Sequence, residues 1–197
     1  MYVKLLNPDW TSRCGYKWII GEWNEATGDI DKPLCTNAWL HYYEHPLLAV
    51  FHNSIHAAIR GPIMVEVEVD RGIKRDGYAK AGARRMRVLR QIECPTVTTE
   101  QRLRYALLCV KTVCDDPAWN RWADGWLDGS DRSAVTAADA ATDDAADTAA
   151  DVAADAAAYA AARIAADAAT RTNPDTNLIE IAERAINYQT GGNNATD

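Results

Sequence analysis

The sequence predicts an α+β protein, with an N-terminal mixed and mainly antiparallel sheet that carries a helix and an all-helical C-terminal half. The segment Met64–Asp70 alternates valine with acidic residues, which is typical of a strand with one face in solvent. Beyond Thr98 apolar residues recur at helical spacing, and residues 137–169 contain 20 alanines in 33 positions. Alanine is the best helix former, so this segment predicts a long helix. We expect a mixed α/β domain over residues 1–95 and a helical region over residues 98–190.

The N-terminal domain is expected to contain four strands and one helix. The strands are predicted over residues 2–6, 17–23, 64–70 and 86–92. A helix is predicted from Pro46, because proline is favoured in a first helical turn and an apolar face follows it at helical spacing. That face consists of Leu48, Phe51, Ile55 and Ile59.

The C-terminal region is expected to contain helices over residues 98–114, 117–128, 133–170 and 176–188, and a disordered tail over residues 191–197. Thr98 or Thr99 can cap the first helix, whereas Pro117 and Gly129 mark the ends of the second. The apolar faces predicted from spacing are Leu103, Leu107, Val110 and Cys114 on the first helix, Trp119, Trp122 and Trp126 on the second, and Leu178, Ile181, Ala182 and Ala185 on the last.

The composition is that of an ordinary globular protein, with 48% hydrophobic and 25% charged residues. No window approaches roughly 18 uninterrupted apolar residues, and residues 1–8 lack the basic and apolar runs of a signal peptide. We therefore expect a cytoplasmic protein with no membrane partner. Five cysteines, an odd number, indicate reduced thiols.

The net charge of −7 divides unevenly along the chain. Residues 1–113 contain 16 Lys and Arg against 12 Asp and Glu, whereas residues 114–197 contain 5 against 16. This asymmetry indicates either two modules or a basic face opposite an acidic face.

Residues 137–169, here called the Ala/Asp segment, carry an acidic stripe. Aspartate recurs every four residues, at Asp139, Asp143, Asp147, Asp151 and Asp155. Because each residue of an α-helix turns about 100°, each step drifts by roughly 40° and the stripe winds slowly around the helix. Val152 and Tyr159 are the expected anchors of this helix, and the face formed by Trp119, Trp122 and Trp126 is the expected surface that receives them.

The acidic stripe has two open interpretations. A charge run is usually a solvated face, and aspartate keeps an alanine helix soluble, so this interpretation is favoured. Alternatively the stripe mimics nucleic acid, because carboxylates about 6 Å apart along the helix axis approach the spacing of phosphates along a DNA strand.

Histidine and cysteine spacing indicates metal chemistry only weakly. Cys35 lies near His41 and His45, and His41/His45 and His52/His56 are two pairs at i and i+4. The residue after His45 is proline, which disfavours helical geometry there, and no Cys-x-x-Cys accompanies the pairs. We expect core or surface histidines, with no metal site and no cofactor.

Basic residues are frequent from the end of the Val-rich strand into the following predicted strand. They are Lys74, Arg75, Lys80, Arg84, Arg85, Arg87 and Arg90. Such a run is most often a solvated hairpin, but it also has the charge to contact the phosphates of a nucleotide or nucleic acid. Docking on the chain's own acidic stripe, or on that of a second copy, is a further alternative.

Glu66-Val67-Glu68 matches the Glu-x-Glu that many ADP-ribosyltransferases place on a strand, and the order of the N-terminal elements resembles their split sheet. The alternation of a half-solvated strand explains both glutamates more simply. No convincing partner arginine or histidine lies on the first strand, so an enzyme is less expected than a binding protein.

Several segments resemble an uncharacterised family of phage and prophage proteins. They are Leu34–Val50, Asn53–Ala57, the Val65–Val69 strand and Trp122–Ser133. The Ala-rich C-terminal part resembles helical repeats in proteins classed as bacterial immunity proteins. The resemblance implies a mobile-element origin in a GC-rich bacterial host, with no established activity and no catalytic residues to carry over.

We therefore expect a non-enzymatic, phage-type accessory protein that binds and modulates a host or defence-system protein. The expected contact surface combines the acidic stripe with Trp119, Trp122 and Tyr159. A homodimer is an open alternative. The alternative functions are a nucleotide-binding, ligand-binding or ADP-ribosyltransferase-like domain in residues 1–95, and a nucleic-acid mimic.

Overall fold

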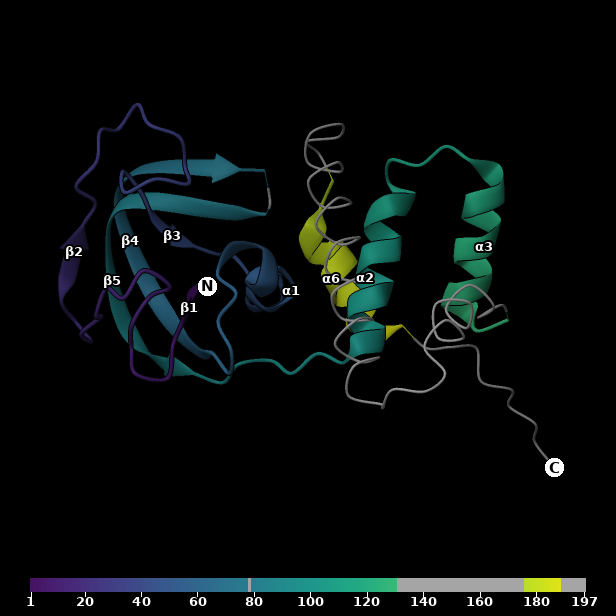
Figure 1. Cartoon of the computed structure of the whole chain (residues 1–197), viewed down its shortest axis with the longest axis horizontal. Helices are drawn as coiled ribbons and strands as arrows, with labels where there is room; N and C mark the ends of the chain where they lie inside the picture. The colour runs from purple at the N-terminus through teal and green to yellow at the C-terminus, as the bar shows by residue number, and fades with distance from the viewer. Residues whose placement is uncertain (78, 131–175, 189–197) are drawn as a thin grey trace, which may run out of the picture.

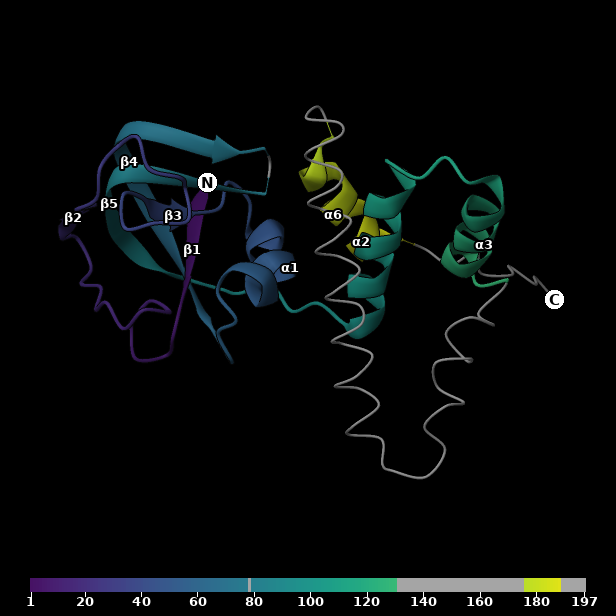
Figure 2. The ribbon, with the colours of Figure 1, turned by 45° about the horizontal axis from the view of Figure 1, so that its top comes forward.

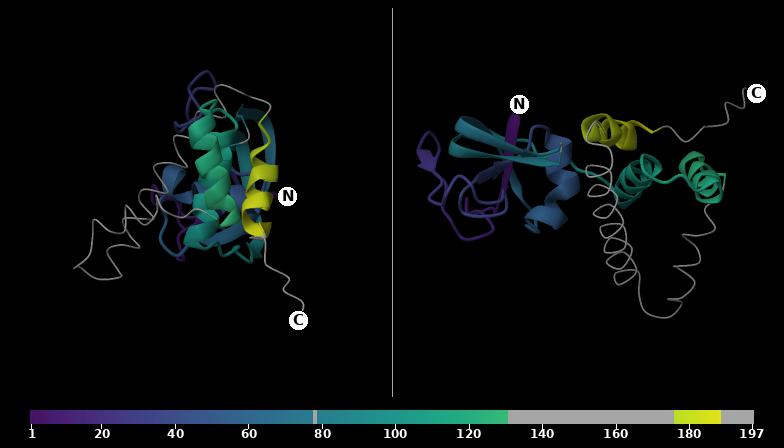
Figure 3. Two further views of the ribbon diagram at one scale, coloured as in Figure 1. Left: turned by 90° about the vertical axis from the view of Figure 1, so that its right-hand side faces the viewer. Right: turned by 90° about the horizontal axis from the view of Figure 1, so that it is seen from above.

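The computed structural model describes residues 1–77, 79–130 and 176–188. These residues form a mixed α+β structure with a curved antiparallel sheet at one end and helices at the other (Figure 1), which confirms the predicted class. The order along the long axis is the sheet, then α1 (Pro46–His56), then α6 (Leu178–Asn187) with α2 (Thr99–Lys111), and then α3 (Pro117–Asp128). The view from above in Figure 3 shows the same order.

The sheet is built around a long hairpin. Strands β4 (Ile63–Asp76) and β5 (Lys80–Ile92) are antiparallel, and β1 (Tyr2–Leu6) pairs with the first part of β4. Two register irregularities, one at Glu66–Val67 and one within Asp70–Ile73, interrupt the β4–β5 ladder. Irregularities of this kind bend a strand pair and increase its twist. Figure 2 shows both strands strongly curved.

Backbone hydrogen bonds connect four of the strands in a ring. Strand β3 (Leu40–Tyr42) pairs with β5 opposite Ala81–Ala83. The next residue, Tyr43, exchanges two backbone hydrogen bonds with Val3 of β1, with N–O distances of 2.9 and 2.8 Å. The path therefore runs from β1 through β4, β5 and β3 and back to β1. Strand β2 (Trp23–Glu25) pairs with another part of β5.

Each face of the sheet has its own apolar cluster. Met64 and Val65 are consecutive in β4, are both fully buried and belong to different clusters, as alternation along a strand requires. The cluster on the Val65 face consists of Leu6, Trp18, Tyr42, Val65, Val67, Ala81, Ala83, Met86 and Val88. The cluster on the Met64 face includes residues of β1 and of all four described helices, so the sheet and the helices share one core.

Local signals in the sequence set the helix ends. Thr98 caps α2 in a capping box with Gln101, with reciprocal hydrogen bonds of 3.2 and 2.8 Å. Asp116 caps α3 ahead of Pro117, and Gly129 ends α3 with a φ of 86°. The predicted second helix and the predicted start of the first are therefore confirmed.

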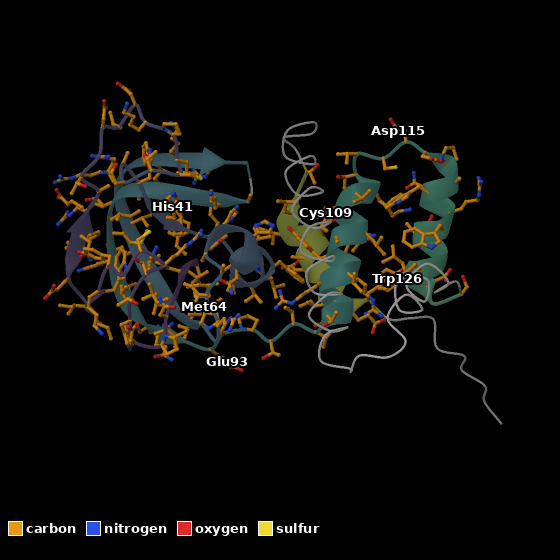
Figure 4. All side chains as sticks on the ribbon, viewed as in Figure 1. His41, Met64, Glu93, Cys109, Asp115 and Trp126 are labelled. Carbon is orange, nitrogen blue, oxygen red and sulfur yellow. The ribbon has the colours of Figure 1, made fainter. Side chains whose placement is uncertain are left out.

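Helix α6 packs between α1 and α2 although it is the last described element of the chain. Its buried residues are Leu178, Ile181, Ala182 and Ala185, which are the four predicted from spacing. Figure 4 labels Cys109 on α2 and Trp126 on α3, two further buried members of the same core.

The predicted strand over residues 17–23 was wrong. Strand β2 begins only at Trp23, and the stretch before it forms isolated bridges at Lys17 and Ile20. Gly21 adopts a φ of 80°, a left-handed conformation that ends any extended run at this point. The expected first strand is confirmed as β1, and the expected strands over residues 64–70 and 86–92 are parts of the longer β4 and β5.

The predicted buried face of α2 was also inaccurate. Leu103, Leu107 and Val110 are only half-buried, whereas Tyr105, Leu108 and Cys109 are at most 4% exposed. One apolar stripe predicts one partner, but α6 and α3 both contact α2, so a wider part of its surface is covered. Cys114 lies beyond the end of the helix at Lys111.

The prediction for α1 holds in its first part. Leu48 and Phe51 are buried in the core, while Ile59 is buried but lies after the helix end at His56. The predicted helix over residues 133–170 and the predicted tail over 191–197 lie outside the described residues. None of the described helices is long and apolar enough to cross a membrane.

Leu178→Ala should lower the free energy of unfolding by about 2–5 kcal/mol, because it removes a fully buried side chain from the core that sheet and helices share. Urea titration would measure the loss. Leu89→Ala changes a leucine that is 39% exposed and should cost less than about 1 kcal/mol. Equal losses in the two variants would contradict the placement of α6 in the core.

Candidate ligand-binding cavity

A cavity of about 880 Å³ lies beside β1 and β3. It is lined by these two strands, the end of β2, the end of α1, the start of β5 and three loop segments within residues 12–18, 26–27 and 35–39. Every described lining residue precedes position 81. The volume is in the range of small-molecule binding sites, so the described N-terminal residues form a site of ligand size.

Positive charge dominates the lining of the cavity. Lys4, Arg13 and Lys80 contribute cations, and Glu25 is the one carboxylate among the described lining residues. Arg13 Nη1 donates a hydrogen bond to the carbonyl of His56 over 3.3 Å, which holds the 12–18 loop against the end of α1. The cavity therefore favours an anion.

Lys4 extends from β1 and is half-buried. Its Nζ donates a hydrogen bond to the His41 carbonyl over 2.8 Å and lies 5.1 Å from the ring centroid of Trp18. Burial lowers the pKa of Lys4 to about 8, and the nearby Cys14 thiol opposes this shift. No described carboxylate is close enough to form an ion pair with Lys4. A buried ammonium of this kind lacks the counter-ion that buried charges normally have.

The two innermost histidines are neutral. Burial, together with the positive charge of Lys80, lowers the pKa of His41 and of His52 to about 4. Both ring nitrogens of His52 are occupied, since Nδ1 donates to the Ala79 carbonyl over 3.2 Å and Nε2 accepts from the Tyr105 hydroxyl over 2.9 Å. His52 therefore serves to anchor α1 to β5 and α2 rather than to exchange protons.

Tyr43 and His56 form a second polar pair in the cavity wall. The Tyr43 hydroxyl donates to His56 Nδ1 over 3.0 Å, and the two rings stack with centroids 6.0 Å apart. Burial raises the pKa of Tyr43 well above its usual value, so the hydroxyl stays protonated and remains a donor.

Aromatic rings form the loop side of the cavity. Tyr16 and Trp18 meet edge to face with centroids 5.5 Å apart. The indole Nε1 of Trp18 is buried and has no hydrogen-bond acceptor among the described residues. By contrast, Trp39 Nε1 donates to the Lys32 carbonyl over 3.0 Å. The cavity therefore offers a ring surface with one unused donor beside its cations.

The structure does not assemble the weak metal candidates into a metal site. Cys35 and His41 both line the cavity, but Cys35 Sγ accepts from Lys80 Nζ over 2.9 Å and His41 Nε2 donates to the Leu34 carbonyl. His45 instead caps α1, where Nδ1 accepts from Leu47 N over 3.3 Å. Within the described ranges, no group of three or more His, Cys, Asp or Glu side chains converges.

Most of the predicted phosphate contacts have protein partners elsewhere. Of the seven basic residues, only Lys80 is among the described residues that line the cavity. The partners of the others are the Lys32 carbonyl for Lys74, Glu44 for Arg75, the loop carbonyls of Ala26, Gly28 and Ala38 for Arg84, Asp70 and Glu25 for Arg85, Glu68 for Arg87, and Glu66 for Arg90. These residues stabilise the curved hairpin and the loop beside it.

The Glu-x-Glu motif lies in a ladder of ion pairs across the hairpin. Glu66 pairs with Arg90 over 2.7 Å, and Glu68 pairs with Arg87 over 2.6 Å. Both pairs are direct cross-strand neighbours in the β4–β5 register. The alternation that first explained the glutamates therefore also gives each one an arginine partner on the next strand.

The predicted interaction residues fall in two groups. Trp119 and Trp122 are half-buried on α3, with ring centroids 6.1 Å apart. Asp139, Asp143, Asp147, Asp151, Asp155 and Tyr159 lie outside the described residues.

Sequence patterns missed the residue that characterises the cavity. In the strand Tyr2–Leu6, Lys4 shares a face with Tyr2 and Leu6, and Leu6 is fully buried. A lysine on an apolar strand face is an unusual placement that could have marked the position. Arg13 and Trp18, by contrast, come from an irregular loop whose path has no periodic signal.

The match to a known family covers this same part of the chain. A sequence model of the family described as a domain of unknown function, DUF7666, matches residues 1–100. The chain belongs to the DUF7666 family. Neither a curated protein nor a solved structure matches it. The matched DUF7666 region contains the described sheet, α1 and all described residues that line the cavity.

Arg84→Gln should lower the free energy of unfolding by about 1–3 kcal/mol, because the guanidinium holds three loop carbonyls beside the cavity. Arg90→Gln is the matched control, since Arg90 is 68% exposed in its pair with Glu66 and should cost less than about 1 kcal/mol. Denaturant titration of both variants would measure the difference. A loss at Arg84 no larger than at Arg90 would show that the loop is held by other contacts.

Proposed function

We propose that residues 1–100 bind a small organic anion in this cavity, with the Lys4 ammonium as its main anchor. The observation that carries the proposal is a half-buried lysine without a described carboxylate partner, in a cavity whose charged lining residues are mainly cations and whose wall contains aromatic rings. The proposal selects the ligand-binding alternative for this region over the enzymatic one.

Charge balance supports an anionic ligand. Taking an ammonium group out of water costs free energy unless an opposite charge or several hydrogen bonds compensate it. Lys4 has one described hydrogen bond, to the His41 carbonyl, and a cation–π contact with Trp18. An anionic ligand would supply the missing counter-ion and would be held more tightly than at an exposed lysine.

The proposal predicts that an aromatic anion binds the full chain with an affinity that depends on Lys4 and on pH. The pKa of Lys4 is lowered to about 8, so the ammonium form that binds an anion is present below that pH. Affinity for an anion of fixed charge should fall as the pH rises through about 8, by up to about tenfold per pH unit. Calorimetric titration with a panel of aromatic carboxylates, sulfate esters and phosphate esters would measure it.

Two variants make this test specific. Lys4→Met should abolish binding and its pH dependence, and it places an apolar side chain in a partly apolar site. Lys111→Met removes a lysine of α2 that does not line the cavity and should leave the affinity unchanged. The proposal fails if no member of the panel binds, or if Lys4→Met binds as the unaltered chain does.

We further infer, as a second candidate function, that the chain binds a host or defence-system protein in the bacterial cytoplasm. Trp119 and Trp122 support this, because they remain half-buried on α3, the helix that lies farthest from the sheet (Figure 1). Half-buried tryptophans are common at protein interfaces. The acidic stripe of the Ala/Asp segment would supply the rest of the contact or would act as the nucleic-acid mimic. A second copy of the chain stays an alternative partner.

Changing Asp143, Asp147 and Asp151 together to asparagine should reduce partner recovery about tenfold or more if the acidic stripe makes the contact. Quantitative mass spectrometry of proteins captured from a bacterial lysate would measure it. The control changes Glu22, Asp29 and Asp31, three exposed acidic residues of the N-terminal region, to the matching amides. If the stripe variant and the control variant capture the same amount of partner, the acidic stripe has no role in the contact.

Substitution tests this surface more cleanly than truncation does. A chain that ends at Asp128 also lacks α6, whose Leu178 and Ile181 are buried in the shared core. Loss of binding by such a truncated chain would follow from unfolding as readily as from loss of the stripe.

A further inference from the structure

We propose that the anion bound in the cavity is a phosphate monoester on an aromatic ring system, such as a nucleoside monophosphate, with the phosphate between Lys4 and Lys80 and the ring against the wall formed by Tyr16 and Trp18. This inference rests on the proposed function and specifies the class of its ligand.

The charge of the cavity fits a dianion better than a monoanion. Lys4, Arg13 and Lys80 oppose the single carboxylate of Glu25, which leaves an excess of two positive charges. His41 and His52 are neutral and add none, because burial lowers the pKa of each to about 4. A phosphate monoester carries between about 1.5 and 2 negative charges near neutral pH, whereas a carboxylate carries one.

Lys4 and Lys80 both line the cavity, and they come from β1 and β5, the two strands that flank β3, which carries His41. The Lys4 ammonium contacts the carbonyl of His41, and both ammonium groups act on the His41 ring strongly enough to lower its pKa. Lys80 has only a cysteine thiol, that of Cys35, as its described hydrogen-bond partner. Two ammonium groups of one cavity without described carboxylate partners match the several oxygens of a phosphate group.

The aromatic wall and its unused donor favour a ring with polar atoms. The buried Trp18 Nε1 has no acceptor among the described residues, although buried indole N–H groups usually have one. Tyr16 lies edge to face with Trp18 and is 52% exposed, so its ring is accessible to a ligand. A nucleobase would supply both a stacking surface and an acceptor, whereas inorganic phosphate would leave this wall empty.

The volume of the cavity favours a nucleotide over a small inorganic anion as the ligand. About 880 Å³ greatly exceeds the space that one phosphate group needs, and it is near the upper end of typical small-molecule sites. A ligand that fills the cavity from the lysines to the tryptophan must therefore carry a sizeable organic group.

Calorimetric titration of the full chain with four probes tests the inference. The probes are adenosine monophosphate, adenosine, inorganic phosphate and the analogue of adenosine that carries a carboxylate in place of the phosphate. Adenosine monophosphate should bind at least about tenfold more tightly than each of the other three, because only it engages both lysines and the aromatic wall. Lys80→Met should remove most of this preference while leaving the weak binding of adenosine unchanged, and Lys111→Met should change neither.

The outcomes separate this inference from the proposed function. Equal or tighter binding of the carboxylate analogue, or binding of some aromatic anion of the wider panel but not of adenosine monophosphate, overturns the phosphate assignment and leaves anion binding standing. Equal affinity for inorganic phosphate and adenosine monophosphate overturns the role of the aromatic wall. Trp18→Phe keeps a ring in the core but removes the N–H, so unchanged affinity in this variant would overturn the assigned hydrogen bond.

Discussion

The pair of backbone hydrogen bonds between Val3 and Tyr43 is the constraint on which the rest of the structure depends. It closes the ring of β1, β4, β5 and β3 that the curved hairpin would otherwise leave open. Lys4 follows Val3 and His41 precedes Tyr43 by two residues, so the same bridge brings the ammonium group within 2.8 Å of the His41 carbonyl. Because α1 begins three residues after Tyr43, the bridge also fixes where that helix packs on the sheet.

The charged residues of the N-terminal region divide into those that stabilise the hairpin and those that line the cavity. Arg85, Arg87 and Arg90 have carboxylate partners on the outer surface of the sheet, and Arg84 holds the carbonyls of the neighbouring loop. Lys4 and Lys80 have no such partners. Most residues of the basic run in the sequence therefore stabilise the hairpin and its neighbouring loop, whereas Lys80 lines the candidate binding site.

Much of the fold follows from the sequence because local signals agree with the tertiary structure. The alternation in β4, the cap at Thr98, the proline and glycine that bound α3 and the apolar spacing of α6 each correspond to an observed element. The face of α2 could not be predicted, because burial there depends on two neighbours, α3 and α6, that approach from different sides. Strand β2 begins later than predicted, because Gly21 adopts a left-handed conformation and interrupts the apolar run from which a single strand was predicted.

The residues of the candidate site were harder to predict from the sequence than the fold, for a physical reason. Its residues come from β1, β3, the end of α1 and irregular loops, so no repeat or motif connects them along the chain. Cys35, His41 and Lys80 were selected for metal or phosphate chemistry on separate grounds, and only the folded chain places all three around one cavity. Lys4 differs from its strand neighbours only in lying on an otherwise apolar face, and that placement alone does not indicate a ligand.

The position of α6 has a consequence for how the protein is made. A ribosome synthesises the DUF7666 region, α2 and α3 well before it synthesises the residues that pack between α1 and α2. Until Leu178 and Ile181 emerge, the surfaces of α1 and α2 that they cover remain exposed to solvent and to other nascent chains. The folding step that completes the core therefore waits for the synthesis of α6, and the interval of exposure lengthens with every residue encoded between α3 and α6.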